Sequence, residues 1–113
     1  MKRFWLFLLL LIAWPVWALE VVATTASMGM LARTVGGTQV RVTELVPPDR
    51  DAHMVQVRPS MIRALRDADL VVAAGAELDD GWLPAALASA ANRAVVPGQP
   101  GYFEAAAHVS LLY

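Results

Sequence analysis

The sequence predicts an α/β domain in which a mostly parallel sheet is flanked by helices. Three apolar segments, 20–25, 39–46 and 70–74, have the length and the β-branched or continuous apolar composition of strands. Segments with apolar residues at helical spacing separate them. Because parallel strands need long crossover connections, usually helical, this alternation favours strand–helix–strand units.

The first predicted strand, 20–25, reads EVVATT and is followed by a predicted helix over 28–35. One of Thr25 to Ser27 can cap this helix, and Gly36-Gly37 ends it. Its apolar residues recur at i, i+3, i+4 and i+7: Met28, Leu31, Ala32 and Val35. This spacing predicts that these four residues form the face that packs in the core.

The second predicted strand, 39–46, stops at Pro47-Pro48, since proline cannot donate to a strand ladder. The next stretch, 49–60, reads DRDAHMVQVRPS and is a loop that holds His53, one of two histidines. Ser60 is the predicted N-cap of a helix whose apolar residues are Met61, Ala64, Leu65 and Ala68.

The last predicted elements follow a buried strand over 70–74. A helix spans 82–91, with Pro84 in its first turn and Asn92 as its C-cap. A short fourth strand is predicted over 94–96, before two proline–glycine turns. Ligands of such sheets bind at the carboxyl ends of the strands, where the loop with His53 emerges.

The first eighteen residues predict a secretory signal peptide. Lys2 and Arg3 precede an apolar run over 4–13, and Val16-Trp17-Ala18 fits a small-x-small cleavage site. The run is shorter than the roughly 20 apolar residues of a membrane span. We therefore expect a signal peptide over 1–18 and one α/β domain over 19–113.

Charge and cysteine content exclude several classes of protein. Nine basic and ten acidic residues give a formal net charge of −1, so nothing indicates a nucleic-acid surface. The chain has no cysteine, and we expect neither a disulfide framework, nor a lipid-anchored cysteine, nor a thiolate metal site. Any metal ion must be held by nitrogen and oxygen atoms.

The chain carries several specific motifs in order. They lie in the segments EVVATTASMGMLARTVGG, VRVTELVPP and DAHMVQVRPSMIRALRDADLVVAAGAELDDGWLP. The most specific parts are Leu45-Val46-Pro47-Pro48, His53 with Pro59-Ser60 after it, Ala68-Asp69-Leu70-Val71-Val72, and Glu77-Leu78 followed by Gly81-Trp82-Leu83-Pro84. Together these motifs strongly resemble the start of the zinc- and manganese-binding family of periplasmic solute-binding proteins that serve ABC importers. The likeness extends from Glu20 to about Leu112.

The resemblance implies two α/β lobes with a metal ion bound between them and delivered to an ABC importer permease in the inner membrane. This chain would be an incomplete amino-terminal lobe of a periplasmic receptor, without the second lobe. By its position His53 matches the family's first metal ligand, and the other ligands lie outside the matched chain. Neutral imidazole with carboxylate oxygens suits Zn²⁺ and is tolerated by Mn²⁺.

Other titratable residues fit simpler interpretations. We expect the second ring nitrogen of His53 to donate to a carbonyl or carboxylate, as metal-bound histidines do. Asp51 is close enough in sequence to be this acceptor, although an exposed loop charge is the favoured interpretation. His108 lies outside any matched motif and is interpreted as a surface or partly buried histidine. The acidic residues Glu77, Asp79 and Asp80 are interpreted as solvated charges at a helix start, and Trp82 as core.

Two alternatives to a binding protein remain at this level. A hydrolase could use His53 as base with Asp51 and a serine, but no Gly-x-Ser-x-Gly elbow is present, so we predict that the protein is not an enzyme. A stand-alone small α/β domain could instead have a metal-independent structural or interaction role.

Overall fold

The fold is a four-stranded parallel sheet with helices on both faces. A computed structural model describes residues 18–110; the predicted signal peptide, apart from Ala18, lies outside them. The strands are β1 (Leu19–Ala23), β2 (Val40–Glu44), β3 (Leu70–Ala73) and β4 (Tyr102–Glu104). Their order is β2-β1-β3-β4, and every neighbouring pair is parallel. The predicted α/β class is confirmed.

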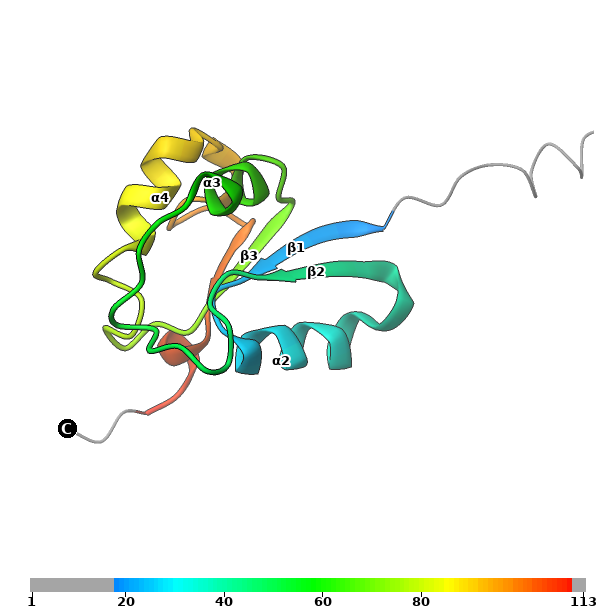
Figure 1. The fold of residues 1–113 in the computed structure, drawn as a ribbon. Coiled ribbons are helices and arrows are strands. Elements are labelled where there is room, and N and C mark those ends of the chain that lie inside the picture. Colours follow the sequence, from blue (N-terminus) through cyan, green and yellow to red (C-terminus); the bar gives the residue numbers. More distant parts are fainter. Residues whose placement is uncertain (1–17, 111–113) are drawn as a thin grey trace, which may run out of the picture.

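The helices form two layers around this sheet. The α-helices are α2 (Ala26–Gly36), α3 (Pro59–Arg66) and α4 (Leu83–Ala90), and the 3₁₀ turns are η1 (Gly37–Gln39), η2 (Arg93–Val95) and η3 (Ala105–His108). In Figure 1, α2 lies on one face of the sheet, whereas α3 and α4 lie together on the other. Within residues 18–110, no helix combines the length and apolar composition needed to cross a membrane.

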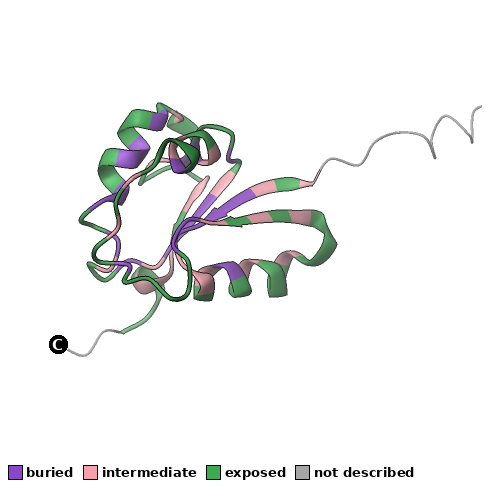
Figure 2. Ribbon diagram, in the orientation of Figure 1, coloured by how far each residue is buried: buried purple, intermediate pink, exposed green. Residues whose placement is uncertain are grey.

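The core lies mainly between the sheet, α3 and α4. Leu65, Val71 and Val95 are completely buried, and Trp82 is 2% exposed, which confirms its predicted place in the core. Burying one such aliphatic side chain contributes roughly 1.5–3 kcal/mol. Figure 2 shows the buried residues concentrated where the strands meet these two helices, while α2 is mostly exposed.

The amino-terminal end of α2 confirms the predicted cap, but only Met28 and Ala32 of its predicted core face are even half-buried. The hydroxyl of Thr25 accepts a hydrogen bond from the N–H of Met28 at 3.3 Å. Leu31 and Val35, expected in the core, are 43% and 82% exposed.

Small residues explain this difference on α2. A Cβ at Gly29 would lie 2.6 Å from Cγ of Glu44, and one at Gly36 would lie 2.5 Å from the side chain of Val40. The helix therefore approaches β2 through a glycine stripe one position away from the apolar stripe. The larger apolar side chains lie beside the contact.

The start of α3 also differs from its prediction. Pro59 is the first helical residue, and the N-cap is Arg58, with an extended backbone, instead of Ser60. A proline restricts the preceding residue to extended geometry and its own fixed φ suits a first helical position, which explains the earlier start. Met61 and Leu65 are buried as the spacing predicts.

Asn92 does not cap α4 but the end of α3. The α4 helix ends at Ala90, and its C-cap is Ala91, which has a left-handed backbone. The side-chain amide of Asn92 donates to the carbonyl oxygens of Leu65, Arg66 and Ala68 at 3.1, 3.1 and 2.9 Å. These carbonyls lie where a helix leaves its last acceptors without intrahelical donors.

We expect Asn92→Ala to lower the free energy of unfolding by about 1–3 kcal/mol, because it removes the donor of several partly buried carbonyl groups. Urea unfolding followed by circular dichroism measures the loss. Ser89→Ala, on the exposed side of α4, is the matched control and should change stability by less than about 0.5 kcal/mol. Equal midpoints for Asn92→Ala and the control would show that this cap is not needed.

The predicted fourth strand over 94–96 is wrong. Residues Arg93–Val95 form η2, whose first turn is held by the N–H of Ala94 donating to the side-chain oxygen of Asn92 at 3.2 Å. The fourth strand is instead β4, paired with β3. Gly101 permits this route, since a Cβ there would lie 2.3 Å from the carbonyl oxygen of Ala94.

Candidate functional site

The carboxyl ends of β1 and β3 form the point where the direction of strand progression changes. The chain adds β2 on one side of β1 and then β3 and β4 on the other, so the loops after β1 and β3 diverge here. In open α/β sheets this is where ligands bind. The buried hydroxyl of Thr24, just after β1, accepts a hydrogen bond from the N–H of Ala74, just after β3, at 3.1 Å.

Asp79 is part of this junction, and its interpretation as a solvated charge is wrong. The residue is 1% exposed, and its Oδ2 accepts a hydrogen bond from the same N–H of Ala74 at 3.1 Å. This contact spans a turn in which Gly75, Ala76 and Glu77 all have positive φ angles of 77°, 52° and 69°. A buried carboxylate needs such partners, and here it closes a strained turn.

Glu77 and Asp80 are exposed, as their solvated interpretation predicts.

His53 lies in the long loop between β2 and α3, which crosses the carboxyl edge of the sheet (Figure 1). The residue before it, Ala52, is buried, and its carbonyl oxygen accepts the indole N–H of Trp82 at 2.8 Å. A Cβ at Gly81 would lie 3.6 Å from the carbonyl oxygen of His53 itself. The loop is therefore packed on the segment that leads into α4.

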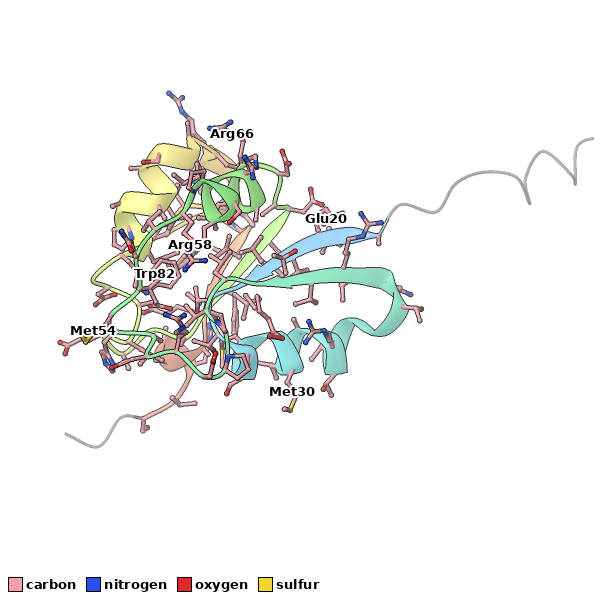
Figure 3. All side chains as sticks on the ribbon, viewed as in Figure 1. Glu20, Met30, Met54, Arg58, Arg66 and Trp82 are labelled. Atoms are coloured by element: carbon pink, nitrogen blue, oxygen red, sulfur yellow. The ribbon has the colours of Figure 1, made fainter. Side chains whose placement is uncertain are left out.

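The side chain of His53 points to solvent from this anchored loop. It is 59% exposed. The next residue, Met54, is 84% exposed, and Figure 3 shows its side chain on the outer side of the loop, away from the sheet. An imidazole in this position is accessible to a binding partner from outside the described domain.

Asp51 contacts His53 twice through one oxygen. Its Oδ1 accepts the backbone N–H of His53 at 2.9 Å and lies 3.0 Å from the ring Nδ1. These contacts, the backbone hydrogen bond first, hold the pKa of the Asp51 carboxyl below its ordinary value. Asp51 is 58% exposed, as interpreted, but it also provides the carboxylate that we expected beside one ring nitrogen of His53.

The other histidine does not join this pair. His108 is exposed, and its ring stacks on that of Phe103 with 4.7 Å between the centroids and 6° between the planes. In the part of the chain that the structure describes, no three histidine or acidic side chains come together as a metal site. Among the described residues, His53 thus lies with Asp51 and without a third histidine or acidic side chain beside them.

Tyr102 lines a second pocket that the sequence did not indicate, because β4 itself was not predicted. Burial raises the pKa of Tyr102 to about 12, and the charges of Asp79, Glu104 and Asp80 add to the effect. Its side chain lines this pocket of about 370 Å³ together with Leu83, Leu87 and Val96.

Comparison with known proteins identifies the family. The family model named ZnuA and described as zinc-uptake complex component A, periplasmic, matches residues 21–110. The chain belongs to the ZnuA family. This confirms the resemblance to periplasmic zinc- and manganese-binding proteins that the motifs indicated.

Individual relatives agree with the ZnuA family assignment. The manganese-binding lipoprotein MntA of Bacillus subtilis is 34% identical over 61 residues, which are 54% of this chain and 20% of MntA. A crystal structure of ZnuA is 29% identical, with a TM-score of 0.60 over 66% of this chain and 29% of the solved chain. The metal-dependent lipoprotein YcdH of Bacillus subtilis is 28% identical, with a TM-score of 0.55 over 60% of this chain and 25% of YcdH.

The same comparisons describe the fold of this ZnuA-family chain and the share of its relatives that it matches. The sheet and helices described above have the fold of solved family members. The chain matches less than a third of the length of each of these relatives.

Proposed function

We propose that this chain forms part of the amino-terminal lobe of a periplasmic receptor that binds Zn²⁺ or Mn²⁺ and passes it to an ABC importer permease. His53 is the metal ligand that the described residues supply. The observation that carries the proposal is the exposed His53 ring, held at the carboxyl edge of the sheet with Nδ1 beside Asp51 and Nε2 free of that contact. The remaining ligands come from outside the described residues.

The chemistry of this donor fits the metals bound by the named relatives. Neutral imidazole is a common zinc ligand and is also found at manganese sites, where carboxylate oxygens complete the coordination. A metal-binding relative is named for manganese, and the family is described by zinc uptake. The ion is the transported cargo, and the predicted leader over 1–18 would direct the receptor to the periplasm.

A binding function also agrees with the surroundings of His53 better than hydrolysis does. Along residues 18–110, its side chain hydrogen bonds only to Asp51, and no serine hydroxyl contacts the ring. A nucleophile activated by histidine must lie within hydrogen-bond reach of it. Capture and release of an ion require no nucleophile.

Line broadening by Mn²⁺ in NMR spectra of the 113-residue chain tests the assignment of His53. We expect low Mn²⁺ concentrations to broaden the signals of His53 and its sequence neighbours first, with an affinity far below that of a complete site. His53→Ala should lose this local broadening. His108→Ala is the matched control, since it removes the other exposed imidazole, and it should keep the broadening. Broadening that survives in His53→Ala would contradict the proposal.

A further inference from the structure

The position of the proton on the His53 ring is set by its neighbour. A neutral imidazole carries one N–H, on either Nδ1 or Nε2, and the hydrogen bond of one nitrogen decides which. An ionised carboxylate can only accept. Because Oδ1 of Asp51 lies 3.0 Å from Nδ1, the neutral ring carries its proton on Nδ1 and has its lone pair on Nε2.

A tight turn gives this arrangement its geometry. The N–H of Met54 donates to the carbonyl oxygen of Asp51 at 3.1 Å, and the N–H of His53 donates to the Asp51 side chain at 2.9 Å. An aspartate at the first position of a turn often accepts from the N–H two residues on. The same oxygen therefore fixes both the backbone and the ring of His53.

On the other side, the turn is tied to the folded domain. The indole of Trp82 holds the carbonyl of Ala52, which lies between the two residues of the pair. The ring is thus exposed but restricted, with Nε2 on the side of the ring opposite the carboxylate.

We propose that Asp51 is a positioning residue for metal capture: it holds His53 in the Nδ1–H tautomer and presents Nε2 as the metal-binding nitrogen. The part of this inference that concerns metal rests on the proposed function, whereas the part that concerns the tautomer does not. An unrestrained neutral histidine favours its proton on Nε2, so Asp51 reverses the intrinsic preference. Without Asp51, the nitrogen that faces outward would carry a proton in most molecules.

The ring ¹⁵N shifts of His53, measured in long-range ¹H–¹⁵N spectra of the 113-residue chain, test the tautomer. The spectra are recorded at a pH high enough that the ring shifts of His53 no longer change with pH. We expect a protonated Nδ1 and an unprotonated Nε2 in the wild type. Asp51→Ala should move the proton to Nε2, and Asp51→Asn, whose amide oxygen can still accept, should retain Nδ1–H. His108 is the control, with unchanged shifts in both variants.

A wild-type His53 with its proton on Nε2, or equal shifts in wild type and Asp51→Ala, would overturn the inference. Mn²⁺ broadening measured in the same samples tests the part of the inference that concerns metal binding. We expect Asp51→Ala to need about 10–100-fold more Mn²⁺ for equal broadening at His53, the usual effect of losing the partner of a metal-bound histidine. Equal Mn²⁺ requirements with a shifted proton would overturn the metal part.

The two proposals fail in different ways. If His53→Ala keeps the broadening while Asp51→Ala shifts the proton, the proposed function fails and the tautomer assignment stands. If His53→Ala loses the broadening while Asp51→Ala leaves the proton in place, the ligand stands and the role of Asp51 fails.

Discussion

Replacing His53 with alanine is expected to weaken Zn²⁺ binding by more than about 100-fold. Losing only an outer partner of a metal ligand usually costs 10–100-fold in affinity, and loss of the ligand itself costs more. The protein for this measurement is expressed from its own gene, with any sequence encoded after residue 113, and is titrated in competition with a chromophoric chelator.

The matched control for this measurement is His108→Ala. It removes the other exposed imidazole, which stacks on Phe103 and does not contact His53, so the affinity of this variant should equal that of the wild type. Equal losses in the two variants would indicate nonspecific imidazole binding. An unchanged affinity in His53→Ala would remove His53 from the site.

Trp82→Ala is expected to cause a larger loss of stability than the other substitutions considered. Truncating a buried tryptophan costs about 3–5 kcal/mol, while whole domains of this kind have only about 5–15 kcal/mol. The indole is 2% exposed and contacts the long loop through the carbonyl of Ala52. Urea unfolding followed by circular dichroism should show a much lower midpoint for this variant.

Trp82→Phe separates packing from the hydrogen bond. The phenyl ring keeps much of the buried area but leaves the Ala52 carbonyl without its donor, which costs about 1–3 kcal/mol. We also expect faster amide exchange at residues 51–54 than in the wild type, because this hydrogen bond ties the loop to the start of α4. Wild-type exchange in Trp82→Phe would show that the hydrogen bond does not hold the loop.

The fold class could be predicted because the relevant signals are local. The β-branched run of β1, the apolar run of β3 and the buried face of α3 each appear within a few neighbouring residues. A cap among Thr25 to Ser27 was predicted for the same reason, since the hydroxyl of Thr25 accepts from an N–H only three residues away.

The failures concern partners that are distant in sequence. The strand β4 is only three residues long, too short to show an alternating pattern, and its position depends on pairing with Val71 and Val72. Asn92 meets carbonyl groups of α3 more than twenty residues earlier. The face of α2 was misassigned because a glycine contact leaves no apolar signal. Each of these outcomes is decided by tertiary contacts, which override local propensity.

Some features of the candidate site could likewise be predicted from the sequence, and others depend on distant residues. His53 was proposed as a site residue from a motif, and its contact with Asp51 could have been assigned from the sequence, because an aspartate two residues before another residue is a common turn partner. The anchoring of the loop by Trp82 could not be predicted from the sequence, since thirty residues separate Trp82 from Ala52. The burial of Asp79 was also not predicted, because it depends on how the loops after β1 and β3 meet.

The placement of β1 between β2 and β3 has a consequence for the order of folding. The unit of β1, α2 and β2 needs only near neighbours, but joining β1 to β3 brings together groups 50 residues apart, as between Thr24 and Ala74. Closing a long loop costs conformational entropy before the contacts that it permits can stabilise the chain. Sheets that pair strands distant in sequence therefore fold slowly. His53 lies inside this closed loop and is fastened by Trp82, which follows β3. The imidazole should therefore reach its final position in a late step of refolding, after the centre of the sheet has formed.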